Sequence, residues 1–189
     1  MSRGAVAWDP AWDPETPAIV ISLVVSSLPV AEWSNFLIAE AGAAATLTGL
    51  VFVAVSINLP RILSYPCLPG RAAESLCQLL GALIVSTTVL IPGQPMNPIG
   101  LELFAIGTLL WAIQTILQIR HVKSNPGQPW SWIVWRMLLS QLATLPFCVA
   151  GLSILIDFPG GLYWIAPGFF FSLVAGVFSA WVLLIEIVR

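Results

Sequence analysis

Long apolar stretches separated by short segments with Pro, Gly or charged residues dominate this chain. A transmembrane helix needs roughly 20 apolar residues to cross a hydrocarbon core about 30 Å thick. Stretches of that length occur five times, and Pro or Gly lies near most of their ends, as is typical of helix boundaries. The predicted spans cover residues 33–59, 72–91, 99–119, 130–156 and 162–188. The pattern predicts an all-α, polytopic transmembrane helix bundle.

The region before the first predicted span does not fit this pattern. Residues 18–31 hold only about a dozen apolar residues, interrupted by Pro29, and are too short for a span. We interpret them as a short interfacial or re-entrant segment. Residues 1–32 then form an extracytoplasmic tail and segment, ahead of a transmembrane domain over 33–189. The alternative is one span over 18–45, which shifts the topology and places charged loops on the wrong side of the membrane.

The distribution of basic residues predicts the orientation. Short loops that are rich in Lys and Arg stay in the cytoplasm. Loops 60–71 and 120–129 carry such residues, namely Arg61, Arg71, Arg120 and Lys123. Loops 91–98 and 157–161 contain no Lys or Arg. We therefore expect the N-terminus outside and the C-terminus in the cytoplasm.

The overall composition agrees with a membrane protein and argues against several classes of function. Only 8% of the residues are charged and 58% are hydrophobic, whereas about a quarter are charged in a typical soluble domain. The basic residues do not cluster, so no nucleic-acid partner is expected. Three widely spaced cysteines and the single histidine, His121, predict neither a disulfide framework nor a metal site. No catalytic, nucleotide or cofactor motif is present, and we do not expect an enzyme.

Polar side chains share one face in each of the second and third spans. Glu74, Gln78 and Thr88 follow one stripe of the second span, and Gln114 and Gln118 follow one stripe of the third. Such groups are costly in hydrocarbon unless they are hydrogen-bonded, so both stripes must face protein or water. One interpretation is a polar network within the subunit. The alternative is a solvated cavity that opens to the cytoplasm.

Ionisable residues inside spans are functional candidates by default. Glu40 and Glu102 lie near the predicted outer boundary, whereas Glu74 and Arg136 lie near the cytoplasmic one, where Arg136 either extends to the interface or pairs with Glu74. The region between them offers only hydroxyls and small residues, which disfavours a proton relay but permits a pore with an apolar or hydroxyl-lined neck. The candidate polar pathway comprises Glu40, Glu74, Gln78, Thr88, Glu102, Gln114, Gln118 and Arg136.

Small residues recur on one face of the first and fifth spans. They are seven residues apart in the first span, at Gly42, Gly49 and Ser56. They are four apart in the fifth, at Gly168, Ser172, Gly176 and Ala180. Small side chains let a second helix approach closely, which is how membrane helices associate. The first interpretation is packing within one subunit, and the alternative is self-association, with the fifth span as the preferred interface.

Part of the chain resembles a known group of proteins. The resemblance rests on the segments WSNF (33–36), AGAAA (41–45), LTGLVFVAVSINL (47–59) and LPGRAAE (68–74). They are similar to a family of small, uncharacterised bacterial multi-pass inner-membrane proteins, some of which are labelled modulators of FtsH protease. The likeness is best over 33–95. It implies a bacterial inner-membrane location and supplies no site residues, because the family has no established site.

Two functions from different classes follow from these features. The first is a homo-oligomeric channel or permeation protein for a small cation or solute, with the polar stripes around a pathway. The second is a non-transporting accessory or regulatory subunit of a larger membrane complex, held by its small-residue faces. The expected partners are membrane lipids and either further copies of the chain or another membrane protein.

Overall fold

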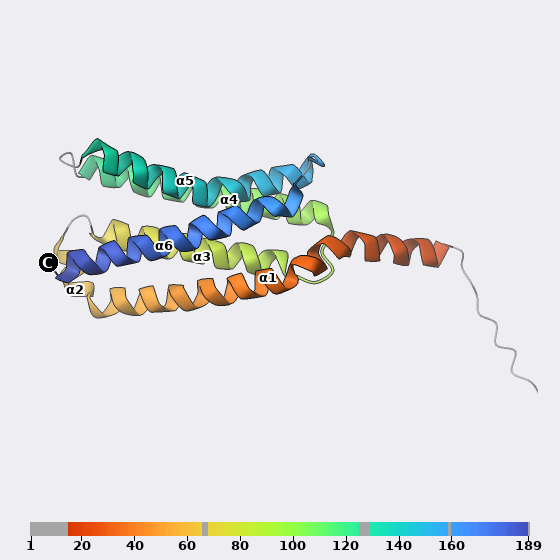
Figure 1. The fold of residues 1–189 in the computed structure, drawn as a ribbon, viewed down its shortest axis with the longest axis horizontal. Helices are drawn as coiled ribbons and strands as arrows, with labels where there is room; N and C mark the ends of the chain where they lie inside the picture. Colours follow the sequence, from red (N-terminus) through yellow and green to blue (C-terminus); the bar gives the residue numbers. More distant parts are fainter. Residues whose placement is uncertain (1–14, 66–67, 125–128, 159, 189) are drawn as a thin grey trace, which may run out of the picture.

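The computed structural model is an elongated bundle of helices (Figure 1). It describes residues 15–65, 68–124, 129–158 and 160–188, and within these residues there is no strand. Residues 1–14 of the predicted tail and Cys67 lie outside the described residues. The elements are α1 (Glu15–Ile57), α2 (Leu59–Ser64), α3 (Leu68–Val89), α4 (Met96–Ser124), α5 (Trp130–Leu155), the 3-10 turn η1 (Gly161–Trp164) and α6 (Ile165–Val188).

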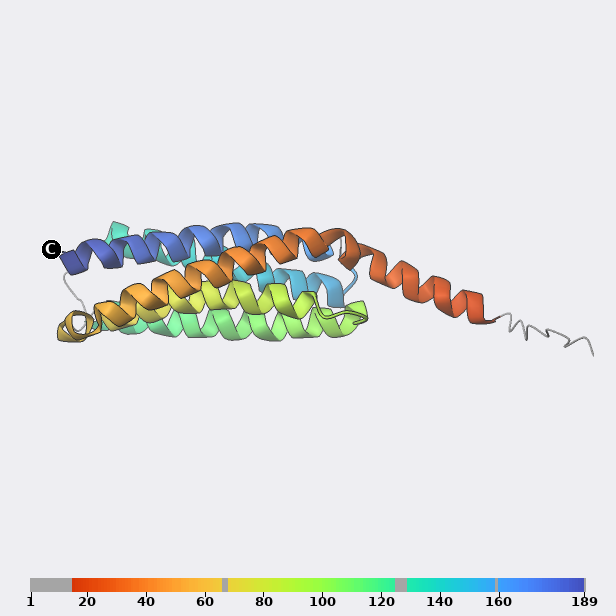
Figure 2. The ribbon, with the colours of Figure 1, turned by 90° about the horizontal axis from the view of Figure 1, so that it is seen from below.

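Five of the described helices are long and apolar enough to cross a membrane, as the sequence predicts. Successive long helices run in opposite directions along the bundle (Figures 1 and 2). The second span begins earlier than predicted, because Pro69 lies in the first turn of α3, where its missing N–H is not needed. The third extends past the predicted 119 through the basic residues of the last turn, His121 and Lys123.

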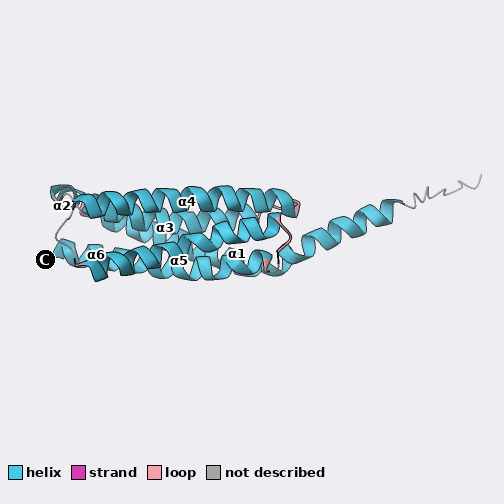
Figure 3. Cartoon of the chain, turned by 90° about the horizontal axis from the view of Figure 1, so that it is seen from above, coloured by secondary structure: helices cyan, strands magenta, loops and turns pink. Residues whose placement is uncertain are grey.

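The long helix α3 occupies the centre of the bundle, where it contacts α1, α4 and α6 (Figure 3). The most extensive contact joins α4 to α5. Glycine makes this contact close: a Cβ on Gly107 would lie 2.8 Å from the backbone nitrogen of Cys148, and one on Gly151 would clash with the backbone of Phe104. Pairs of backbones pack this tightly in membranes where small residues meet.

The N-terminal part of the chain differs from the expectation. Residues 18–31 are not a separate or re-entrant segment, because α1 continues unbroken from Glu15 to Ile57 and passes through Pro29. A proline removes a backbone hydrogen bond, but a membrane helix can continue across it. The first part of α1 extends beyond the end of the bundle (Figures 1 and 2). Within α1, Glu32–Ile57 is long and apolar enough to span a membrane, and the alternative span over 18–45 stays a prediction.

Candidate functional site

Buried polar side chains from four helices meet near the end of the bundle where α3 begins. Glu74 of α3 is at the centre. One carboxylate oxygen, Oε2, accepts a hydrogen bond from the Arg136 guanidinium of α5 and forms an ion pair with it. The other, Oε1, accepts from Nε2 of Gln118 on α4 at 2.9 Å. Both oxygens of a nearly inaccessible carboxylate therefore have partners, as a buried charge requires.

A second layer of amides extends this polar cluster toward the middle of the bundle. Nε2 of Gln114 donates to the backbone carbonyl of Glu74 at 3.1 Å and to Oε1 of Gln78 at 2.5 Å. Nε2 of Gln78 donates to Oγ of Ser172 at 3.1 Å, and Ser172 donates to the carbonyl of Ala143 at 3.2 Å. The network thus joins α3, α4, α5 and α6.

The two polar stripes of the sequence therefore face each other. Gln78, Gln114 and Gln118 are at most 5% exposed, and their amide nitrogens donate to groups of the same chain. This arrangement corresponds to the intramolecular network and not to a wide solvated cavity. Because hydrocarbon offers no hydrogen-bonding groups, amide side chains on neighbouring helices bond to each other.

The other members of the candidate pathway lie apart from the cluster. Thr88 is about 21 Å from Glu74 along α3, at 1.5 Å per residue. Glu102 accepts hydrogen bonds from Nε2 of Gln94 at 2.9 Å to both of its oxygens. Glu40 is half-buried on α1, and its Oε2 has no hydrogen-bond partner among the described residues. These three residues do not join the five that meet at Glu74.

An apolar layer separates the cluster from the far end of the bundle. Its side chains come from α3, α4, α5 and α6, and all are at most 9% exposed. They are Ala82, Val85, Leu103, Leu110, Phe147 and Phe169. The rings of Phe147 and Phe169 are in edge-to-face contact, with centroids 5.2 Å apart. Two buried hydroxyls lie beside this layer, and each donates to a carbonyl of its own helix: Ser86 to Ala82 at 2.8 Å and Thr144 to Ser140 at 3.0 Å.

The small-residue face of α6 packs inside the subunit. A Cβ on Gly168 would lie 2.8 Å from the Phe147 ring, and one on Gly176 would lie 2.6 Å from the side chain of Leu79. Ser172 is fully buried and belongs to the polar network, and Ala180 is half-buried. The preference for α6 as the self-association interface is therefore wrong, because the chain itself occupies this face.

The small-residue face of α1 has the opposite environment. Gly42, Gly49 and Ser56 are exposed, and a Cβ on either glycine would meet nothing within 4 Å. The expectation of internal packing is wrong here, because α1 packs through its other side. That side carries Leu37, Ala44 and Val51 at the same spacing of seven, and all three are buried.

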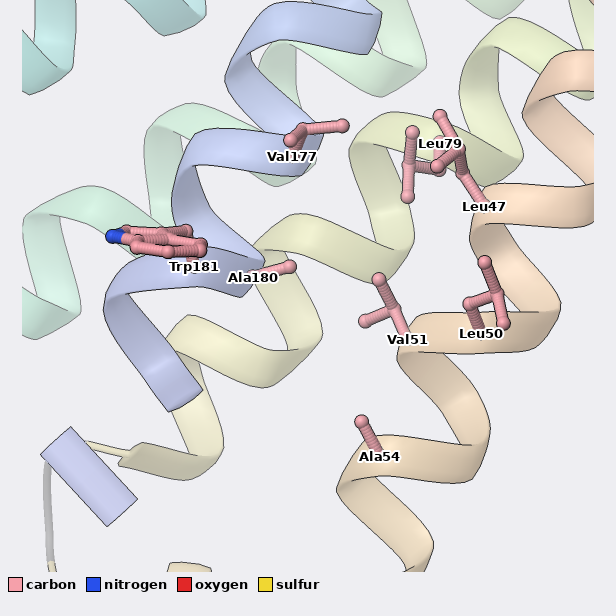
Figure 4. Close-up of a pocket in the computed structure, with 8 residues that line it drawn as sticks. All are labelled: Leu47, Leu50, Val51, Ala54, Leu79, Val177, Ala180 and Trp181. Atoms are coloured by element: carbon pink, nitrogen blue, oxygen red, sulfur yellow. The ribbon is translucent and has the colours of Figure 1, made fainter. Parts of the chain in front are cut away.

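A groove of about 200 Å³ lies between α1 and α6 (Figure 4). Side chains of α1 form one wall and side chains of α6 the other. The lining residues are Leu47, Leu50, Val51, Ala54, Leu79, Val177, Ala180 and Trp181. Hydrocarbon side chains supply most of this lining, so the groove holds no group for acid–base or metal chemistry. Within the described part of the chain, no three or more His, Cys, Asp or Glu residues form a group that could hold a metal ion.

Sequence reasoning did not assign several residues of this region. The sequence predicts Ser172 in a packing face, and in the structure it also accepts a hydrogen bond in the network. Gln94, which binds Glu102, is eight residues earlier in a loop, and helical periodicity does not connect the two. The guanidinium of Arg71 lies over the Trp132 ring at 5.8 Å from its centroid, a contact between residues far apart in the sequence. Such pairings depend on which helices are neighbours.

Comparison with known proteins adds nothing to these residues: no family model, no curated protein and no solved structure matches this chain.

Proposed function

We propose that this protein is a non-transporting subunit of a membrane complex, held to its partner through the outward face of α1. The observation that carries the proposal is the exposure of Gly42 and Gly49, with open space beside both. The polar stripes, which a channel within one subunit would need, are used in internal hydrogen bonds. The multi-pass chain then acts by contact between helices in the bilayer.

The α1 face suits contact with another helix. Its hydroxyls are satisfied by their own helix, since Thr46 Oγ1 donates to the Gly42 carbonyl at 2.7 Å and Ser56 Oγ to the Phe52 carbonyl at 2.8 Å. A second helix can therefore cover this face without leaving these donors unpaired. Glycine at two positions allows close backbone approach, which gives the van der Waals contact that drives association in lipid.

The location and orientation belong to the same proposal. We place the chain in a bacterial inner membrane, with the N-terminus outside and the polar cluster at the cytoplasmic end. The support is the distribution of basic residues, since Arg61 and Arg120 flank helix ends on that side. Reporter fusions after residue 64 and after residue 124 should both report the cytoplasm, and fusions after residues 93 and 158 should both report the outside.

The test of the subunit proposal is the size of the native complex. In gently solubilised membranes, the parent chain should migrate as a species larger than the monomer, and Gly49→Leu should return it to the monomer. Val174→Leu is the matched control, because it adds bulk at an exposed position of α6. A parent chain that migrates as a monomer, or a Gly49→Leu complex of unchanged size, would exclude the α1 interface.

A specific observation also favours a second candidate, the homo-oligomeric channel. The exposed face of α1 carries Asn35, Thr46 and Ser56 beside the glycines. In a closed ring of subunits these residues would form a shared pathway with a hydroxyl-lined neck, while the polar cluster stays internal. Ion conductance of the purified chain in planar bilayers separates the candidates, since the subunit proposal predicts no current.

A further inference from the structure

Two small cavities lie on either side of Arg136 in the polar cluster. The first has a volume of about 20 Å³ and lies between α3, α5 and α6; its polar lining is Glu74, Gln78, Arg136 and Ser140. The second has a volume of about 10 Å³ and lies between α4 and α5; its polar lining is Gln118, His121 and Arg136. Arg136 lines both cavities.

Each cavity is lined by a buried residue with an unsatisfied atom. Ser140 is 5% exposed, and its Oγ has no hydrogen-bond partner among the described residues. Gln118 is 3% exposed, and although its Nε2 donates to Glu74, its Oε1 has no partner among them. Buried hydroxyls and amide oxygens are rarely left without a partner, because desolvation without a hydrogen bond is costly. Each of these two atoms therefore needs a hydrogen-bond partner that is small enough to fit in its cavity.

We propose that each cavity binds one water molecule, and that Arg136 is a common donor to both. A water molecule needs roughly 10–15 Å³ and two to four polar partners. In the first cavity these are Ser140 Oγ, an N–H of Arg136 and an oxygen of Glu74 or Gln78. In the second they are Gln118 Oε1 and another N–H of Arg136. A guanidinium has five N–H donors, more than its pair with one carboxylate oxygen uses.

The size and charge of the cavities favour water over other ligands. Neither volume admits a larger solute. Glu74 already shares its charge with Arg136 and accepts a second bond from Gln118, so the first cavity offers no unused carboxylate to a cation. The two waters supply partners to Ser140 Oγ and Gln118 Oε1 beside the ion pair. This inference is independent of the proposed function.

The direct test is an experimental structure at a resolution that shows ordered water. One density peak is expected in each cavity, within hydrogen-bond distance of Ser140 Oγ in the first and of Gln118 Oε1 in the second. A well-resolved map without these peaks would overturn the proposal. A peak in one cavity alone would overturn it for the other.

A stability measurement tests the first cavity independently. If Ser140 binds water, Ser140→Ala loses a hydrogen bond, and the unfolding equilibrium constant should rise about fivefold. If the hydroxyl has no partner, its removal should leave that constant unchanged or lower it, and this result would overturn the proposal there. Ser86→Ala is the matched control, because it removes a buried hydroxyl that has a known partner: Ser86 Oγ donates to the Ala82 carbonyl at 2.8 Å.

Radiolytic footprinting tests the second cavity. Short X-ray exposure produces hydroxyl radicals from bound water, which oxidise the side chains beside it. Met137 lines this cavity and is half-buried. Its oxidation should be strong in the parent chain and should fall several-fold in Gln118→Leu, which removes a proposed partner and fills space. Equal oxidation in both chains would argue against water at this place.

Discussion

The helices α1 and α6 carry similar stripes of small residues and use them differently. In α6 the stripe receives Phe147 and Leu79 from neighbouring helices and contributes Ser172 to a hydrogen-bond network. In α1 the corresponding glycines face open space. The difference lies in the partner and not in the stripe, because a small residue packs only where a larger side chain is positioned to fill the space beside it.

The environment of each helix explains this difference. α6 lies against both α3 and α5, and it reaches large side chains on each of them. α1 has only α3 as an extensive neighbour, and 17% of its most apolar window is buried, compared with 56% for α3. One side of α1 is sufficient for that contact, so the opposite side is available to lipid or to another protein.

The largest effect is expected at the network that α6 shares with α3, α4 and α5. Glu74→Leu should destabilise the protein by about 3–5 kcal/mol, because it leaves the buried Arg136 without its counter-charge. Replacing both residues by Leu should recover a large part of that loss, since neither charge then remains buried. Reversible unfolding in mixed micelles measures both values. A double variant as unstable as Glu74→Leu would contradict this account.

The next effect compares the two small-residue faces directly. Gly176→Leu on α6 should lower the free energy of unfolding by about 2–3 kcal/mol, because even a Cβ comes within 2.6 Å of Leu79. Gly49→Leu on α1 should leave it unchanged or raise it by up to about 1 kcal/mol, because nothing lies within 4 Å and leucine has a higher helix propensity than glycine. The same unfolding assay applies. Equal destabilisation by both variants would remove the distinction between an occupied and an open face.

The sequence predicts the number of spans well because hydrophobic length depends only on the chain itself. It also offers the pair between Glu74 and Arg136 as one of two alternatives for Arg136, and the structure shows this pair. It does not separate an occupied small-residue face from an open one. Periodicity places Gly49 and Gly176 on their helices, but the neighbours of those helices follow from the packing of the whole bundle.

The N-terminal segment shows a second limit. Pro29 and the short apolar length of 18–31 indicate a break, yet α1 is continuous through both. The penalty of one proline is local, whereas the helical hydrogen bonds on either side remain, so the helix resumes. A predicted boundary therefore needs more than one unfavourable residue. That residues 18–31 are interfacial stays a prediction.

Replacing the two carboxylates Glu102 and Glu40 should change the stability by smaller amounts, with opposite signs at the two positions. Glu102→Leu should destabilise the protein by about 1 kcal/mol, because the Gln94 amide loses its acceptor. Glu40→Leu on α1 should stabilise it by a similar amount, since it removes an oxygen that has no partner among the described residues. The two variants remove the same group from two spans of one protein, so the opposite signs in the unfolding assay separate a hydrogen-bonded carboxylate from an unpartnered one. Stabilisation by Glu102→Leu would contradict the pairing.

The smallest effect distinguishes shape from hydrogen bonding on the α1 face. Thr46→Val keeps the branched shape and removes a hydroxyl that already bonds to its own helix, so both stability and complex size should be nearly unchanged. Thr46→Leu adds bulk and should dissociate the complex, as Gly49→Leu does. A different result would be an ion current in bilayers that Thr46→Val abolishes while the complex remains. The Thr46 hydroxyl would then line a path for ions, and the channel would describe the protein better than the non-transporting subunit.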